Sequence, residues 1–134
     1  MQEAVESLKR GGSPLDIVEA GIRPVEADPA IPHVGTGGAP NILGELEMDA
    51  AIMDGCSLRV GAVGALKAYV SAIWLARQVL EVLPHTMIVG EGAAIFAAER
   101  GAPPIVQTPE RIAAEHQAWL VSHVPAAALE NWPK

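Results

Sequence analysis

Gly35-Thr36-Gly37-Gly38 has the composition of a fragment of a phosphate-binding loop. It lacks the preceding strand, the following helix and the Gly-Lys-Ser/Thr sequence that such a loop requires. We therefore predict a tight turn that brings backbone amides close to another surface. His33 lies in the same glycine-rich loop and is the only histidine at a plausible site, although loop histidines more often have a structural or solvated role.

The other groups that could act as acids, bases or nucleophiles lack partners. His116 and His123 fall on one predicted helix at a spacing too long for a shared zinc site, and we expect both to be solvated. His85 precedes an apolar strand, where a histidine more often satisfies backbone groups. Cys56 is predicted in a hairpin turn without a cationic cluster, so it is not expected to be a nucleophile. No serine lies in a Gly-x-Ser-x-Gly turn.

Two carboxylates interrupt or end an apolar segment. Asp49 lies between Met48 and Ala50 in a predicted strand, and Asp54 comes just before a glycine turn. Charged carboxylates are rarely buried without hydrogen-bond partners, so both are interpreted as structural acceptors, although Asp49 could also orient a catalytic group. The residues alone provide no complete set of nucleophile, base and oxyanion hole, and no catalytic residue is assigned within this chain.

Helical patterns open the chain. Residues 2–10 form an amphipathic pattern that ends at two glycines, and a second helix is predicted from Ser13, with Pro14 at its first position and Asp16 three residues after the cap. Pro24 is expected to kink or end that helix. Residues 28–44 are dense in proline and glycine and predict a loop.

The rest of the pattern predicts a hairpin flanked by helices, and hence a layered α+β fold rather than a doubly wound parallel sheet. Both hairpin strands are apolar on both faces, which predicts a sheet covered on both sides. Gly90-Glu91-Gly92 is predicted to form a turn, and Thr108 to cap the last helix ahead of Pro109. The predicted elements are strands at 46–54, 58–66 and 85–89, helices at 70–82, 93–99 and 109–122, and a mobile tail at 124–134.

Composition narrows the class of protein. Half of the residues are hydrophobic and the net charge is −7, without a lysine or arginine cluster, so nucleic acid and anionic membrane surfaces are poor partners. A single cysteine excludes an internal disulfide and fits a reducing compartment. No apolar run is long enough for a membrane span and no signal peptide is evident. We expect a cytoplasmic protein.

Residues 11–97 resemble the α subunit of glycosylasparaginase, a branch of the threonine asparaginase family of N-terminal nucleophile hydrolases. The motifs that carry the resemblance are Gly11-Gly12 before Leu15-Asp16, Glu26 and Asp28-Pro29, Val34-Gly35-x-Gly37-Gly38-x-Pro40, Asp49-Ala50-x-Ile52-Met53-Asp54-Gly55, Gly61-Ala62-Val63, Ala76-Arg77, and Pro84-His85 before Val89-Gly90-x-Gly92-Ala93.

The resemblance implies an αββα sandwich cut by self-processing into α and β subunits, of which this chain supplies about half. Residues 1–123 would be the α-subunit part of that domain, and the assembly would be an (αβ)2 heterotetramer. The nucleophile would be a threonine at the start of the β subunit, attacking a small side-chain amide substrate. This chemistry would require no metal or organic cofactor. His33, Gly35, Thr36 and Gly37 would then lie next to the active site.

The sequence departs from the family pattern at three points. The family's first strand, with its substrate-proximal tryptophan, has no counterpart here, and the chain stops without the His-Asp pair that usually precedes the nucleophile. His33 stands where a small hydroxyl residue is common. Gly37-Gly38-Ala39-Pro40 favours the glycosylasparaginase type; the alternatives are a plant-type asparaginase and isoaspartyl peptidase, and a non-catalytic scaffold chain.

Overall fold

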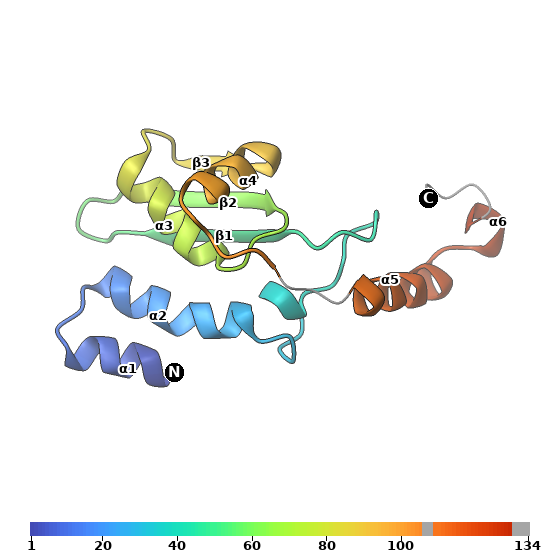
Figure 1. Cartoon of the computed structure of the whole chain (residues 1–134), viewed down its shortest axis with the longest axis horizontal. Helices are drawn as coiled ribbons and strands as arrows, with labels where there is room; N and C mark the ends of the chain where they lie inside the picture. Colours follow the sequence, from blue (N-terminus) through green and yellow to red (C-terminus); the bar gives the residue numbers. More distant parts are fainter. Residues whose placement is uncertain (106–108, 130–134) are drawn as a thin grey trace.

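The computed structural model describes residues 1–105 and 109–129 of the chain. Figure 1 shows helices at the N-terminal end, a small sheet with its own helices, and further helices toward the C-terminus. The elements are α1 (Gln2–Lys9), α2 (Pro14–Ala27), the 3-10 turn η1 (Gly35–Gly37), β1 (Met48–Met53), β2 (Val60–Leu66), α3 (Ala72–Val82), β3 (Met87–Val89), α4 (Gly90–Glu99), α5 (Pro109–His123) and α6 (Ala126–Leu129).

The three strands form one sheet in the order β1-β2-β3, and the α+β class is confirmed. The predicted hairpin is present as the antiparallel pair β1 and β2, and β3 adds to β2 in parallel after the α3 crossover. The β1–β2 register shifts between Met48 and Ala50, where Ala65 on β2 has a positive φ of 49°. This irregularity is a β-bulge, which places one extra residue on β2 next to Asp49.

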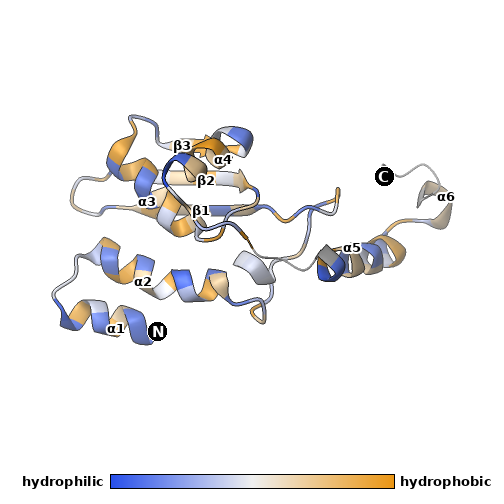
Figure 2. Ribbon diagram, in the orientation of Figure 1, coloured by the Kyte–Doolittle hydropathy of each residue, from blue (hydrophilic) through white to orange (hydrophobic). Residues whose placement is uncertain are grey.

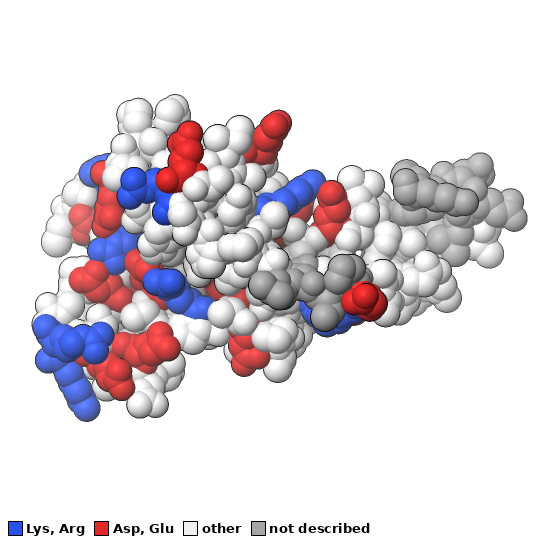
Figure 3. Space-filling view, in the orientation of Figure 1, with Lys and Arg blue, Asp and Glu red and all other residues white. Residues whose placement is uncertain are grey.

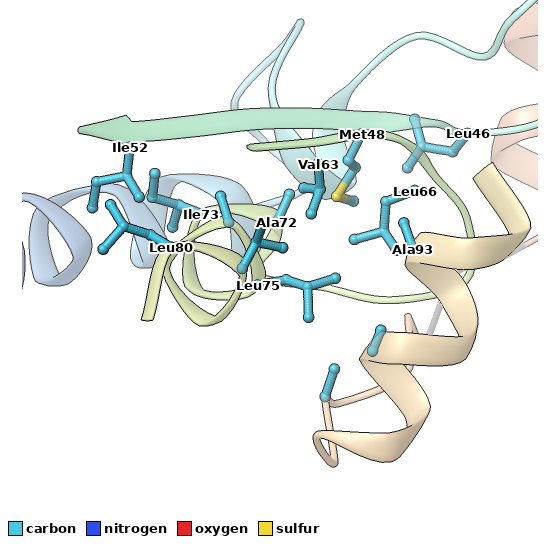
Figure 4. Packing of buried hydrophobic residues seen from close by; sticks show 14 of the residues in the cluster. Leu46, Met48, Ile52, Val63, Leu66, Ala72, Ile73, Leu75, Leu80 and Ala93 are labelled. Atoms are coloured by element: carbon cyan, nitrogen blue, oxygen red, sulfur yellow. The ribbon is translucent and has the colours of Figure 1, made fainter. Parts of the chain in front are cut away.

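The helices that contact the sheet, α3 and α4, pack on one of its faces. Figure 4 shows Ile52, Met48 and Val63 pointing from the strands toward α3 and α4. The largest fully buried side chains are Val63 and Leu66 on β2 and Leu75 and Val79 on α3. β2 and α3 approach so closely that a Cβ added to Gly61 would lie 2.1 Å from the carbonyl oxygen of Ala76.

The opposite face of the sheet is exposed, and no element in the described part of the chain supplies the second cover that the sequence predicts. Met53, Met87 and Val89 are each more than half exposed, at 53%, 52% and 56%. A Cβ added to Gly64 would contact Met87, Val89 and Asp49, which identifies them as neighbours on this face. We call this surface, formed by Asp49, Ala51, Met53, Ala62, Gly64, Met87 and Val89, the open face.

α2 begins as predicted but ends later. Ser13 accepts a hydrogen bond from the amide of Asp16 at 3.2 Å, and the Asp16 carboxylate accepts one from the Ser13 amide at 2.8 Å, a complete capping box. Pro24 neither ends nor breaks the helix, which continues to Ala27. Of the predicted kink or early end, the early end is therefore wrong: Pro24 lies in the last turn, and Glu26, which follows it in the same helix, is buried.

One further boundary differs from the predictions. Gly90-Glu91-Gly92 opens α4 instead of forming a separate turn, with Gly90 at a positive φ of 55°. The tail contains the short helix α6, while its last residues, 130–134, and the predicted cap Thr108 lie outside the described residues. Within the described helices none has the length and apolar character needed to cross a membrane.

The distribution of hydrophobic and charged side chains agrees with the way in which the helices pack. Figure 2 shows hydrophilic and hydrophobic residues alternating along α1 and α2. Arg77 on α3 links this helix to α2, because its side chain forms salt bridges with Asp16 at 2.7 Å and with the buried Glu19 at 3.0 Å. Arg77 also pairs with Glu81 on its own helix at 2.7 Å. Hydrogen bonds from Ser13 and Arg77 lower the pKa of Asp16 to about 2. On the face seen in Figure 3, acidic and basic side chains are interspersed.

Candidate functional site

The glycine loop packs directly against the backbone that precedes it. Gly35 has a φ of 55°, and a Cβ added there would lie 2.0 Å from the carbonyl oxygen of Glu26. A Cβ on Gly37 would lie 1.9 Å from the carbonyl oxygen of Ile31. These distances confirm the predicted close approach to another surface, and they explain why glycine is needed at both positions.

His33 introduces this loop in a left-handed conformation, with a φ of 71°. Positive φ is uncommon outside glycine, and such outliers occur preferentially at functional sites. The exposed His33 side chain lines two cavities. One includes Trp119 on α5, and the other includes Glu26 and Asp49.

Thr36 connects the loop to α5 by a hydrogen bond. Its carbonyl oxygen accepts a hydrogen bond from Arg111 Nη2 at 2.6 Å, whereas its hydroxyl is buried without a partner among the described residues. The loop is therefore held between the end of α2 and the start of α5. Its position depends on segments that are far apart in sequence.

Glu26 is the buried acid of the site, and sequence reasoning gave it no role. It is only 4% exposed; Oε1 accepts a hydrogen bond from the Ile73 amide at 3.0 Å, at the start of α3, and Oε2 has no partner among the described residues. Burial raises its pKa to about 7 against the opposing effect of the Ile73 amide. The signal that could have found it is spacing, because Leu15, Glu19, Ile22 and Glu26 form one helical stripe.

The raised pKa of Glu26 predicts a pH-dependent stability. Because its folded-state pKa of about 7 exceeds the ordinary value of 4.5, the folded state binds the proton more tightly. The stabilisation is complete below the unfolded pKa and is lost as pH rises through the folded pKa, by about 1–3 kcal/mol. In denaturant unfolding of the assembled protein, Glu26→Gln should flatten this fall in the free energy of unfolding.

Glu91→Gln provides the control, because Glu91 is an exposed acid at the start of α4. It should leave the slope of stability against pH as in the unaltered protein. A Glu26→Gln variant with an unchanged slope would show that another group titrates in this range.

Asp49 and Asp54 occupy opposite ends of β1 and do not form one site. Asp49 Oδ1 accepts the amide hydrogen of Ala65 at 2.8 Å, at the β-bulge. Its side chain is exposed on the open face, so the expectation of a buried environment was wrong. Asp54 orders the hairpin turn by accepting hydrogen bonds from the Cys56 amide at 3.1 Å and the Ser57 hydroxyl at 2.5 Å. Only Asp49 lies near the glycine loop, in a shared cavity.

The remaining candidates lie elsewhere. His116 is not simply solvated, because its Nε2 lies 2.9 Å from the carbonyl oxygen of Ile42. His123 stacks on Trp119, with ring centroids 5.1 Å apart, and Cys56 is exposed in the hairpin turn. Within the part of the chain that the structure describes, no group of three or more metal-ligating side chains is present.

Comparison with known proteins shows to which family this chain belongs. The model of a family described as asparaginase matches residues 1–130. This chain belongs to the asparaginase family. The resemblance found through the glycine loop and the Asp49 strand is thereby confirmed at the level of the family.

Similar asparaginase-family members carry two kinds of name. An isoaspartyl peptidase/L-asparaginase of Macaca fascicularis is 47% identical over 98 residues, 73% of this chain and 32% of the relative. An N(4)-(β-N-acetylglucosaminyl)-L-asparaginase of Rattus norvegicus is 42% identical over 114 residues, 85% of this chain and 33% of the relative. One of the same name from Elizabethkingia miricola is 37% identical over 131 residues, 96% of this chain and 38% of the relative. The chain thus spans about a third of the length of these relatives.

Proposed function

We propose that this chain is the α subunit of a self-processed β-aspartyl amide hydrolase that releases aspartate from asparagine or N4-glycosylated asparagine. The family match over residues 1–130 is the observation that carries the proposal. The exposed apolar face of the sheet supports it, because a second sheet from a β subunit would cover that face and complete an αββα sandwich. An (αβ)2 assembly in the cytoplasm, with residues 1–123 as the α-subunit part of the domain, belongs to the same proposal.

The chemistry would centre on a threonine at the start of the β subunit. Its hydroxyl adds to the side-chain amide carbon while its own α-amino group, with an ordinary pKa near about 8, takes the proton. The proton passes to the leaving nitrogen as the carbon–nitrogen bond breaks. Water then hydrolyses the threonyl ester and releases aspartate. No metal or organic cofactor is needed for these steps.

This chain would contribute the loop that borders the active site beside the nucleophile. The loop with His33, Gly35, Thr36 and Gly37 is held in place by close backbone packing and by the hydrogen bond from Arg111. A loop that borders an active site must be held rigidly in this way. Asp49 holds the bulge of β2 at the adjoining edge of the sheet. None of these side chains is assigned a bond-making step.

Turnover by the purified assembly tests the proposal. GlcNAc-asparagine, asparagine and a β-aspartyl dipeptide are assayed in parallel, and N-terminal sequencing with intact mass spectrometry identifies the partner chain. A partner that begins with threonine and hydrolysis of the first two substrates are expected. Preference for the dipeptide would indicate an isoaspartyl peptidase. If none of the substrates is hydrolysed, the result would favour the alternative that the chain is a non-catalytic scaffold.

Substitution of His33 should change the choice of leaving group. An imidazole in place of a small hydroxyl narrows the cavity beside the nucleophile, so we expect discrimination against a bulky glycosylated amine. His33→Ser should raise kcat/KM for GlcNAc-asparagine relative to asparagine by an amount equivalent to about 1–3 kcal/mol. An unchanged substrate ratio would show that His33 is a solvated loop residue.

A further inference from the structure

Asp54 and Gly55 begin the turn between β1 and β2 and form the one Asp-Gly pair in the sequence, which contains no Asn-Gly pair. Such a pair is chemically reactive, because the amide nitrogen of the glycine can attack the aspartate carboxyl carbon and close a succinimide ring. Glycine favours this ring because it has no side chain to hinder the attack and it reaches backbone conformations closed to other residues. No described atom lies within 4 Å of a Cβ added to Gly55, so packing around the turn does not obstruct the ring.

Hydrogen bonds inside the turn restrain the Asp54 side chain. Oδ1 accepts the Cys56 amide at 3.1 Å, and Oδ2 accepts the Ser57 amide at 3.2 Å and the Ser57 hydroxyl at 2.5 Å. The Ser57 hydroxyl is held in turn by the Arg59 amide, which donates to it at 3.4 Å. Both carboxylate oxygens are therefore engaged, and the shortest of their hydrogen bonds comes from a side chain.

These hydrogen bonds oppose ring closure in two ways. They direct the carboxylate oxygens to the amides of Cys56 and Ser57 rather than presenting the carboxyl carbon to the Gly55 nitrogen. They also favour the charged carboxylate, whereas ring closure expels the hydroxyl of the neutral acid. Hydrogen bonds from Ser57 and Cys56 accordingly lower the pKa of Asp54. The turn is thus reactive by its sequence and protected by its hydrogen bonds.

We propose that Asp54-Gly55 is a site of spontaneous isomerisation to isoaspartate in this chain, and that the Ser57 hydroxyl holds the reaction back in the folded protein. The inference is independent of the proposed function, since it needs neither the nucleophile nor a substrate. Isomerisation would lengthen the backbone of the turn by a methylene group. The hydrogen bond from the Asp54 amide to the Arg59 carbonyl oxygen, at 3.0 Å, closes the hairpin at this point and would have to rearrange.

The rearrangement has no net reagent, because one water molecule leaves and another enters. As the Gly55 nitrogen bonds to Cγ of Asp54, the carbon–oxygen bond to the carboxyl hydroxyl breaks, and the hydroxyl leaves with the amide proton as water. A second water molecule then hydrolyses the imide. Attack on the Asp54 main-chain carbonyl carbon leaves the chain linked through the former side chain as isoaspartate, whereas attack on Cγ restores aspartate.

The rate of isoaspartate formation in the assembled protein tests the proposal. Samples held at neutral pH are analysed by peptide mapping and by enzymatic methylation of isoaspartyl residues. We expect Ser57→Ala to raise the rate in the folded protein by about tenfold, the effect of losing one hydrogen bond to a charged group. Ser57→Thr retains a hydroxyl and should stay close to the unaltered protein. In denaturant, the unaltered protein and Ser57→Ala should react at the same, faster rate.

Two controls assign the effect to this turn. Asp54→Glu in the Ser57→Ala background lengthens the side chain, so that cyclisation is far slower and the signal from the turn should disappear. Gly101→Ala strains a backbone outside the hairpin, at a φ of 72° with nothing within 4 Å of the added Cβ, and should leave the rate at Asp54 unchanged.

Each part of the proposal can fail separately. Equal rates in the folded unaltered protein and in folded Ser57→Ala overturn the role of Ser57, as does an equal rise in Gly101→Ala, which would indicate general destabilisation. An unaltered protein that isomerises as fast when folded as in denaturant overturns the protection by the turn, and this comparison does not depend on the folding of any variant. Absence of isoaspartate at Asp54 even in denaturant overturns the site itself.

Discussion

Produced without a partner chain, this polypeptide is expected to self-associate and to lack a cooperative unfolding transition. Its open face exposes Met53, Met87 and Val89 by 53%, 52% and 56%, and the helices that contact the sheet, α3 and α4, pack on its other side. A contiguous apolar surface of this kind is typical of an interface rather than of a monomer surface. Light scattering coupled to size exclusion, followed by thermal unfolding, measures both properties.

A matched pair of substitutions shows whether the open face is responsible. Met87→Lys places a charge on that face, on the edge strand β3, and should reduce self-association of the isolated chain. Leu8→Lys places the same charge on α1, at a residue 61% exposed and away from the sheet, and should have little effect. A monomeric, cooperatively unfolding isolated chain would contradict the prediction that another chain covers this face.

Gly35→Ala is expected to destabilise the assembled protein by about 3 kcal/mol or more, as the sum of a left-handed backbone penalty and overpacking. The added methyl would lie 2.0 Å from the carbonyl oxygen of Glu26 and 2.3 Å from its Cα, so the loop or the end of α2 must move. Denaturant unfolding measures the loss. If the loop borders the nucleophile as proposed, kcat should fall with it.

Gly11→Ala separates the left-handed backbone penalty from the effect of overpacking. Gly11 has a φ of 76°, as unfavourable for alanine as that of Gly35, but nothing lies within 4 Å of the added Cβ. Its substitution should cost only the backbone penalty, about 1–2 kcal/mol. Equal losses in the two variants would show that the close approach to Glu26 is relaxed at little cost.

Much of the architecture could be predicted because its causes are local. The capping box joins Ser13 to Asp16, and a hairpin follows from two apolar strands separated by a short turn. Both features depend on residues close together in the chain, whose types limit the available backbone conformations. The motifs around the glycine loop and Asp49 were likewise sufficient to indicate the asparaginase family.

Long-range packing decided what local patterns could not. Pro24 and Gly90 are helix breakers by type, yet each lies in a helix. The exposure of Asp49 depends on which face of the sheet the helices cover, and apolar residues on both faces of its strand do not reveal that.

The sequence by itself determined the family, the α+β class and the elements whose signals are local. Only the tertiary structure brought Glu26 to the Ile73 amide, across 47 residues, and beside His33 and Asp49 in one acidic cavity. Periodicity marks a residue as lying on a buried stripe, but it does not say whether that residue meets a partner. The burial of Glu26, with one carboxylate oxygen left without a partner among the described residues, arises from contacts between segments that are distant in the chain.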